Sequence, residues 1–459
     1  MKRIGILTAG GDTPALNATL FGAVVRANER RIEMIGFIKG FSSLLNPRMP
    51  HVYLNPLFST IPELDPTLGG SILGSSRDYV DAGNKPVVAQ IAERLAQLRI
   101  DGLVCIGGDG TLNGMQALSE SLPAVLAPKT IDNDLGLNYH HEPDEWQRHP
   151  GDEPESFRYV KTPSRTKFDI EQMVNYVTPG YATAVFVSAS GVQRVRTTAE
   201  SHRRIVIIEV MGRHSGYIAL GSAFGQPDVL LVPEHPLDLD GLVDRVHEVY
   251  ELQKHCVIVC AEGIVDARGR DLGQEKPSFD PAGNVVLSGA AEALRNMLIG
   301  RFGDEYFRSR RRNETAKEAI FTRKIGHTQR GGRPILFDRF YASQLGGHAV
   351  DLLLQGCVNQ VAVLQWNRAR GFHVSGVPAN DFRDRWGLIH SRKMHPDCYD
   401  PVNFRLSQTG IDYLLPIFSN SVGADDTEAI RTTLFDNGNL LRPYHSVNTD
   451  VGKRIRYLE

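Results

Sequence analysis

The chain has 459 residues, of which 41% are hydrophobic and 23% are charged, and this length predicts two or three domains whose cores need neither a metal nor a disulfide. Its formal net charge of −2 argues against general binding to nucleic acid or to an anionic membrane. No stretch is apolar and long enough for a signal peptide or a membrane span, and the five cysteines lack C-x-x-C spacing, so we expect a cytoplasmic protein with reduced cysteines.

Short apolar, β-branched runs alternate with helical patterns along most of the chain. The expected strands are residues 3–7, 102–106, 124–127, 205–210, 229–232, 256–260 and 360–364. Continuous apolar runs are typical of parallel strands that are buried on both faces. Between them lie helices such as 86–98, where Val88, Ile91 and Leu95 recur at helical spacing. This order predicts a doubly wound α/β fold that binds ligands at the carboxyl ends of its strands.

Two polar regions interrupt this alternation. Residues 136–175 are irregular and rich in proline and charge, which indicates a functional lid or a disordered insertion. His140, His141 and His149 leave a metal site there as an alternative, but a solvated loop or a subunit contact is favoured because no metal-ligand spacing repeats. The second region runs from about residue 380 to the end and shows only modest helical patterning.

Two glycine-rich turns follow predicted strands, TAGGDTPALN at 8–17 and IGGDGT at 106–111. The second is neither a Walker loop, since no Gly-Lys-Ser/Thr follows, nor a dinucleotide fingerprint. Paired glycines let the backbone approach an anion, and the following helix offers free N–H groups. Asp109 stands where it could hold Mg2+ on a polyphosphate. The two turns together predict a phosphate site.

A third turn, PKTIDND at 128–134, follows another predicted strand. It sets Asp132 and Asp134 beside a lysine and a threonine. One carboxylate could take a proton from an attacking hydroxyl while the other orients groups or approaches a metal. A helix cap with an Asx turn remains an equally good interpretation of the same residues.

Cationic motifs occur downstream, at the ends of predicted strands: SHRR at 201–204, MGRHSG at 211–216 and GHTQRGGR at 326–333. Arginine suits a phosphate clamp because its planar group makes paired hydrogen bonds. A surface arginine is usually only solvated, but an arginine flanked by glycines in such a turn is less often so.

Taken together, these motifs resemble the phosphofructokinase family, whose members phosphorylate fructose 6-phosphate at C1. The likeness runs in the family's order from Lys2 to about Gly356, through GGDTPALNA, GSSR ending at Arg77, GGDGT, PKTIDND, SHRR, EVMGR, CAEG and GHTQRGG. It implies two doubly wound, Rossmann-like lobes with mainly parallel sheets. The implied parts are a donor-phosphate lobe at 1–135, completed by about 328–390, an insertion at 136–177, a sugar-phosphate lobe at 178–327 and a C-terminal extension at 391–459.

The resemblance also implies roles for individual residues. The donor phosphates would contact Gly11, Arg77, Gly108, Asp109, Gly110, Thr111 and Lys129. Asp109 would hold Mg2+, Asp132 would be the general base with Asp134 beside it, and Arg77 and Arg213 would neutralise the transferred phosphoryl group. The substrate would contact Thr130, Asp132, Arg204, Met211, Gly212, Arg213, Glu262, Arg323, His327 and Arg330. Because Arg204 would reach a neighbouring subunit's site, we expect a homodimer or homotetramer.

Members of this family use ATP or pyrophosphate as the donor. Pyrophosphate users typically carry Asp where this chain has Gly110, and a carboxylate there would crowd and repel the α-phosphate of a nucleotide. Lys129 points the other way, since pyrophosphate users usually carry that lysine. A flexible lysine can bond either donor, whereas a nucleotide needs the open volume, so we expect ATP, with pyrophosphate as the alternative.

The chain differs from the pattern of this family at several positions. Phe21 and Val25 replace the arginines of the effector site in bacterial members, so nucleotide-diphosphate activation is expected to be absent or altered. Phe321 stands where the family has an arginine, with Arg323 as a possible substitute.

NAD kinases and lipid kinases share GGDGT but lack TIDND and GHTQRGG. A silent regulatory subunit would have lost residues such as Asp132, and a different sugar-phosphate acceptor remains an open alternative.

Overall fold

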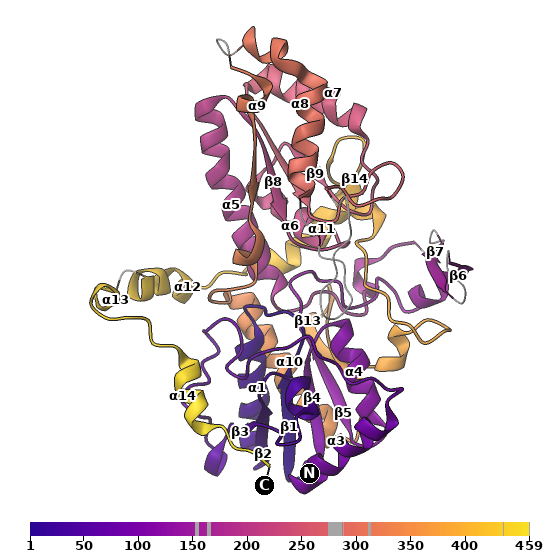
Figure 1. Ribbon diagram of the computed structural model, residues 1–459, viewed down its shortest axis with the longest axis vertical. Coiled ribbons are helices and arrows are strands. Elements are labelled where there is room, and N and C mark those ends of the chain that lie inside the picture. Colours follow the sequence, from indigo (N-terminus) through magenta and orange to yellow (C-terminus); the bar gives the residue numbers. More distant parts are fainter. Residues whose placement is uncertain are drawn as a thin grey trace.

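The computed structural model describes residues 1–151, 156–162, 167–273, 287, 289–310, 314–434 and 436–458. The molecule is elongated and has two α/β lobes, with the first residues in the lower lobe of Figure 1 and the middle of the chain in the upper one. Each lobe is built around one sheet, and most neighbouring strands pair in parallel. The predicted α/β class is confirmed.

Within the described residues, the sheet of the first lobe has seven strands in the order β13-β12-β5-β4-β1-β2-β3. Their bounds are β1 Arg3–Thr8, β2 Glu33–Phe37, β3 His51–Tyr53, β4 Gly102–Gly107, β5 Ala124–Pro128, β12 Gln360–Asn367 and β13 Gly371–Pro378. The edge strands β3 and β13 pair antiparallel with their neighbours. Ile4 and Ile6 belong to one apolar cluster and Leu7 to another, so β1 is covered on both faces, as its continuous apolar sequence predicted.

Helices cover both faces of this sheet. Leu16 and Leu20 of α1 Leu16–Glu29 belong to the same apolar cluster as Ile4, and α10 Leu336–Leu354 packs along α1. Residues of α3 Lys85–Gln97 and α4 Asp109–Ser119 belong to the opposite cluster. The helix predicted at 86–98 is confirmed to within one residue at each end.

The sheet of the second lobe has the order β11-β8-β10-β9 within the described chain, and all its pairings are parallel. Its strands are β8 Ile205–Val210, β9 Val229–Leu231, β10 Cys256–Ala261 and β11 Ile320–Lys324, with helices α5 Tyr181–His202, α7 Leu239–Gln253 and α8 Ala290–Arg308 around them. Of the strands in the two large sheets, the prediction missed β2, β3, β11 and β13. Strands β11 and β13 are only partly buried, so they lack the continuous apolar run that marked the others.

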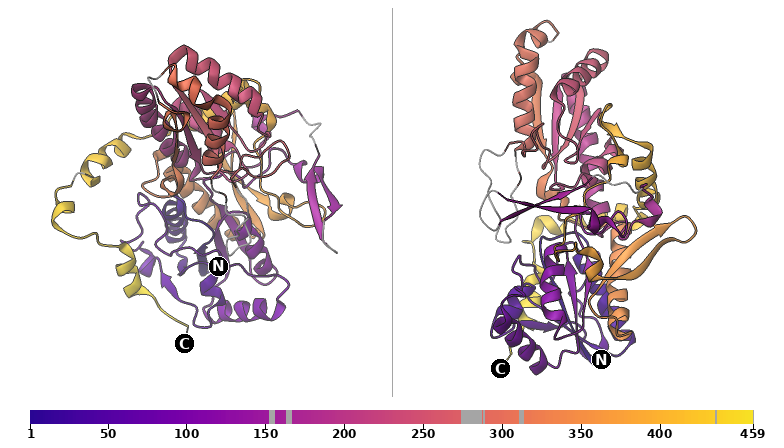
Figure 2. Two further views of the ribbon diagram at one scale, coloured as in Figure 1. Left: turned by 45° about the horizontal axis from the view of Figure 1, so that its top comes forward. Right: turned by 90° about the vertical axis from the view of Figure 1, so that its right-hand side faces the viewer.

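Part of the insertion forms regular structure that the sequence did not predict. It forms a hairpin of β6 Trp146–Pro150 and β7 Phe157–Lys161 that projects from the body (Figures 1 and 2). The segment looked irregular in the sequence because most of the hairpin's side chains are exposed, which leaves no apolar alternation to recognise. One contact that holds it is the stacking of Trp146 on His390, with ring centres 3.7 Å apart. Residues 152–155 and 163–166 of the predicted insertion lie outside the described residues.

The C-terminal extension returns to both lobes. Helix α11 Gln408–Phe418 buries Tyr413 against Tyr176. The chain then runs through α12 Ala424–Ala429 and α13 Gly438–Leu441, away from the body, to α14 Val447–Arg454 on the first lobe (Figure 1). None of the helices in the described ranges combines the length and apolarity needed to span a bilayer.

Candidate active site

A cavity of about 300 Å3 opens where strands of both lobes end. The turns after β1, β4 and β5 line it from the first lobe, and Arg213, which follows β8, lines it from the second. Doubly wound sheets bind ligands at such carboxyl ends. The sequence-predicted residues that line it are Gly11, Arg77, Gly108, Asp109, Gly110, Thr111, Lys129, Thr130, Asp132, Asp134, Arg213 and Arg330. Phe41, Tyr79 and Asn113 also line it and were not predicted, since no motif singled them out.

One wall of the cavity is made of backbone that suits an anion. Gly10 has a φ of +80°, which favours glycine, and the N-terminus of α4 begins at Asp109. The buried Lys129 ammonium donates to the carbonyl of Gly11. Burial, followed by the charge of Arg330, lowers the pKa of Lys129 to about 7, and the nearby charges of Asp12, Asp132 and Asp134 only partly offset this.

A side chain at Gly110 would have open space around it, whereas Gly107 has no room for one. A Cβ built on Gly107 would come within 1.9 Å of Thr111 Oγ1, but one built on Gly110 would meet no atom within 4 Å. Gly110 also lines the cavity. The missing side chain at Gly110 is therefore space available to a ligand.

The carboxylate of Asp109 stands at the start of α4. Its Oδ1 accepts the N–H of Gly110 at 2.8 Å, and its Oδ2 accepts the hydroxyl of Ser391 at 3.0 Å. Ser391 was not predicted, because it lies 282 residues away in a segment without a motif.

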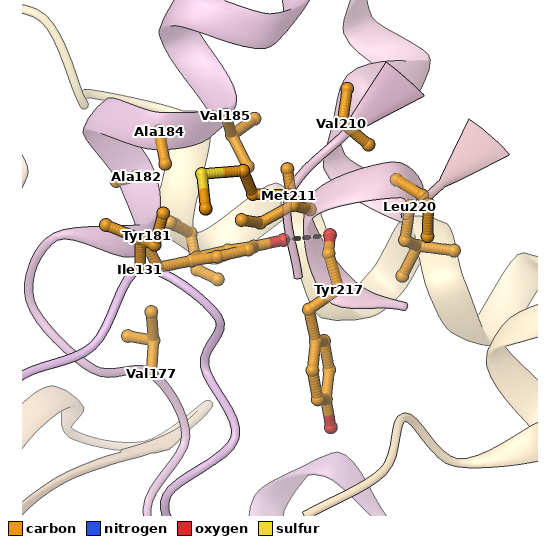
Figure 3. Close-up of a cluster of buried hydrophobic side chains, with 14 of the residues drawn as sticks. Ile131, Val177, Tyr181, Ala182, Ala184, Val185, Val210, Met211, Tyr217 and Leu220 are labelled. Carbon is orange, nitrogen blue, oxygen red and sulfur yellow. Dashed lines mark hydrogen bonds between the residues drawn. The ribbon is translucent and has the colours of Figure 1, made fainter. Parts of the chain in front are cut away.

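Asp132 and Asp134 stand on the turn after β5. Ile131 anchors this turn in an apolar cluster with Val177 and Tyr181 (Figure 3). The N–H of Asp132 donates to Thr130 Oγ1 at 3.0 Å, and that hydroxyl donates to Asp134 Oδ1 at 3.1 Å. The equally weighted alternative of a cap with an Asx turn therefore does not describe the position of both carboxylates, which line the cavity.

The carboxylates are buried, and their surroundings disfavour a second negative charge. Asp132 is 4% exposed, and its Oδ1 has no hydrogen-bond partner within the described structure, which is costly for a carboxylate that has no further role. Burial, with the charges of Asp132 and Asp109, raises the pKa of Asp134 to about 7. Groups with such shifts in a cavity are candidates for proton transfer.

Two guanidinium groups face Asp132. Arg213 Nε and Arg330 Nη2 each lie 3.9 Å from Asp132 Oδ2. Arg213 has a φ of +52°, a left-handed conformation that costs a non-glycine residue about 1–3 kcal/mol and is concentrated at functional sites. Its N–H donates to Glu262 Oε1 at 3.2 Å, and burial together with the charge of Asp132 raises the pKa of Glu262 to about 7.

The remaining predicted residues do not line this cavity: Arg204, Met211, Gly212, Glu262, Arg323 and His327. Met211 and Glu262 are buried, and Glu262 accepts the N–H of Arg213, while His327 is exposed and its carbonyl accepts the N–H of Arg330. Arg204 precedes β8 and so lies at the opposite end of that strand from Arg213. Arg204 and Arg323 flank the ring of Phe321, with Cζ 6.0 and 5.2 Å from its centre.

The alternative of a histidine metal site in the insertion finds no support. His140, His141 and His149 are exposed. Across the described ranges, no three side chains of the metal-ligating types come together as a metal cage.

Comparison with known proteins bears on the same residues. The family model described as Phosphofructokinase matches residues 3–139 and 163–353. The chain is 35% identical over 381 residues to ATP-dependent 6-phosphofructokinase 2 of Streptomyces coelicolor, covering 82% of this chain and 93% of that protein. It is 32% identical, with the same coverage, to a pyrophosphate–fructose 6-phosphate 1-phosphotransferase of the same organism. Its fold is similar to that of a pyrophosphate-dependent phosphofructokinase from Marinobacter aquaeolei, with a TM-score of 0.67, 18% identity and 92% of each chain covered.

Proposed function

The chain belongs to the phosphofructokinase family, and we propose that it is a 6-phosphofructokinase that transfers the terminal phosphoryl group of MgATP to the 1-hydroxyl of fructose 6-phosphate. As a member of this family it is a phosphotransferase with an alcohol acceptor. The observation that carries the proposal is the convergence of Asp132, Arg213 and Arg330 beside the donor turns in one cavity. In this assignment the first lobe binds the donor and the second lobe binds the sugar phosphate.

The chain's own residues supply a base and charge neutralisation. Asp132 accepts the proton of the sugar hydroxyl as its oxygen bonds to the terminal phosphorus and the bond to the leaving phosphate breaks. Arg213, Arg330 and Arg77 neutralise the charge on the transferred group. Phosphoryl transfer asks a protein mainly for such positioning and electrostatic stabilisation.

The residues of the cavity also fit Mg2+. This ion is usually held by one or two carboxylates together with the phosphates of its substrate, and not by a cage made of protein alone. Asp109 is such a carboxylate, and its charge helps to raise the pKa of Asp134. When bound, Mg2+ would neutralise charge on the donor phosphates. Asp109 would hold it, and the hydroxyl of Ser391 would keep that carboxylate oriented.

The choice of ATP rests on the open volume at Gly110 and on aromatic side chains at the cavity. Phe41 and Tyr79 line it, and Tyr79 is 55% exposed, so it offers a ring face to a purine. Curated relatives with similar identity are named for both donors, so donor choice has to be measured on this chain.

One assay tests the whole assignment. Initial rates would be measured with ATP and with pyrophosphate, each crossed with fructose 6-phosphate, glucose 6-phosphate and a seven-carbon ketose phosphate. We expect the highest kcat/KM for ATP with fructose 6-phosphate. Activity with pyrophosphate alone would overturn the donor, a preference for another sugar would overturn the acceptor, and inactivity with every pair would overturn the function.

We further propose that the active form is a homo-oligomer. Arg204 lies at the far end of β8 from Arg213, so in this assignment it serves the sugar-phosphate site of a second copy. A six-residue strand spans about 20 Å, whereas an extended arginine side chain covers less than half of that length.

A further inference from the structure

We propose that Arg392 is a positioning residue for phosphoryl transfer, through which the C-terminal strap (residues 383–395) holds the turn that carries Asp132 and Asp134. This inference rests on the proposed function of that turn. The strap lies beyond residue 353, where the match to the family model ends, so it is not part of the motifs that identify the site.

The first observation is what Arg392 bonds. It is 3% exposed, and its guanidinium donates to the carbonyl of Asn133 from both Nε, at 3.2 Å, and Nη2, at 2.7 Å. Its Nη1 donates to the carbonyl of Asn175, and its backbone N–H donates to the carbonyl of Asp134 at 2.6 Å. The buried arginine ties the turn at Asn133 and Asp134 to the segment at Asn175, and each of these bonds would be costly to lose in this setting.

The second observation is that the turn needs such support. Asn133 has a φ of +57°, a left-handed conformation that is uncommon for residues with a side chain and that asparagine adopts more readily than most. Its side chain donates to Tyr413 Oη at 2.6 Å and accepts from the N–H and the hydroxyl of Thr178 at 2.9 and 3.1 Å. Asn133 is thus anchored in the interior by Arg392 and Tyr413, both from the C-terminal part of the chain.

The third observation is the direction of the neighbouring side chains. Asp132 and Asp134 line the cavity while Asn133 is fully buried. Asn133 therefore anchors the turn in the interior while its two neighbours face the cavity. A tilt of the backbone at Asn133 would move both carboxylates. A displacement of about 1 Å caused by a distant mutation can cost about a hundredfold in rate.

The strap also touches the donor side of the cavity. Ser391 donates to Asp109, and Arg383 donates to Asn113 Oδ1 at 2.8 Å on α4. The same short segment therefore joins the helix that carries Asp109 to the turn that carries Asp132. The strap therefore holds the proposed metal-binding carboxylate, Asp109, and the proposed base, Asp132, at a constant distance from each other.

The test uses the full-length protein and two variants. Arg392→Lys keeps the charge but lacks the planar fork that reaches the carbonyls of Asn133 and Asn175 in their present positions, and Tyr413→Phe removes one hydroxyl while it keeps the packing volume. Arg385→Lys, an exposed change in the same strap, is the matched control. We expect kcat to fall about ten- to hundredfold in Arg392→Lys and about three- to tenfold in Tyr413→Phe, with both KM values within about threefold of the wild type.

The outcomes separate positioning from simple stability. A kcat within twofold of the wild type in both variants, or a change confined to KM, would overturn the inference. If Arg392→Lys does not fold, Tyr413→Phe decides by the same criterion. Amide exchange of a peptide covering 129–136 gives a readout that does not depend on activity. Faster exchange there, with unchanged exchange in β8 and β10, is expected even if the wild type proves to act on another substrate.

Discussion

Arg213 Nε lies 3.9 Å from Asp132 Oδ2, and the two residues come from different lobes. This pair brings the proposed base of the first lobe against a cation that follows β8 of the second. The separation is too long for a hydrogen bond and short enough for a strong charge interaction. A phosphoryl group placed between the donor turns and Asp132 would lie against this cation.

Replacing the proposed base tests its role directly. In Asp132→Ser we expect kcat to fall by about 10²–10⁴, because general base catalysis contributes that much. Binding of fructose 6-phosphate, measured by calorimetry, should be retained. Near-normal turnover in this variant would remove Asp132 from the mechanism.

Donor choice should respond to Gly110. Gly110→Asp introduces a carboxylate into open volume, so the fold should tolerate it while the α-phosphate of ATP is repelled. We expect kcat/KM for ATP to fall at least about tenfold, since roughly 1.4 kcal/mol of repulsion is enough for that factor, and the ratio of pyrophosphate to ATP activity to rise. Gly300→Asp, an exposed position on α8 where a Cβ also meets no atom, is the control and should change neither donor. An unchanged ratio in Gly110→Asp would contradict the assignment.

Stability should depend on pH through Asp134. Its pKa is raised to about 7 in the folded state, above that of an unfolded aspartate, so the folded state binds the proton more tightly. The resulting contribution to stability is full below about pH 4 and is lost as pH rises through 7. Asp134→Asn removes this loss and should be more stable than the wild type at pH 8, by on the order of 1–3 kcal/mol, while the difference shrinks at pH 4.

Urea unfolding at the two pH values measures this effect. Exposed Asp244→Asn on α7 serves as the control and should show no such pH-dependent difference. The gain should come with a loss of activity, because a functional carboxylate is removed. Equal stability of Asp134→Asn and the wild type at pH 8 would contradict the shifted pKa.

The proposed sharing of sites between subunits predicts complementation between two inactive variants. Asp132→Asn and Arg204→Ala should each be nearly inactive, and mixing them 1:1 after subunit exchange should restore about a quarter of wild-type activity. In random dimers half of the molecules are hybrids, and each hybrid holds one intact site of two. Activity that stays at the level of the separate variants would show that Arg204 does not act across subunits.

The sequence by itself determined the elements whose information is local. Continuous apolar runs marked β1, β4, β5, β8 and β10, because strands buried on both faces need apolar residues throughout. In PKTIDND and GGDGT the polar residues of interest are close together in the sequence, and each turn directly follows a strand. The sequence therefore predicted Asp109, Asp132 and Gly110 at one edge of the sheet, where the structure places them.

Only the tertiary structure decided what supports these residues. The hairpin β6–β7 is exposed and is held by stacking on His390, so its sequence carries no strand period. The bonds of Ser391 to Asp109 and of Arg392 to Asn133 span 282 and 259 residues. No local pattern encodes such pairs, because neither partner's type or spacing is special until folding brings the C-terminal strap against the turn that carries Asp132 and buries Arg392 between backbone carbonyls and the ring of Tyr217.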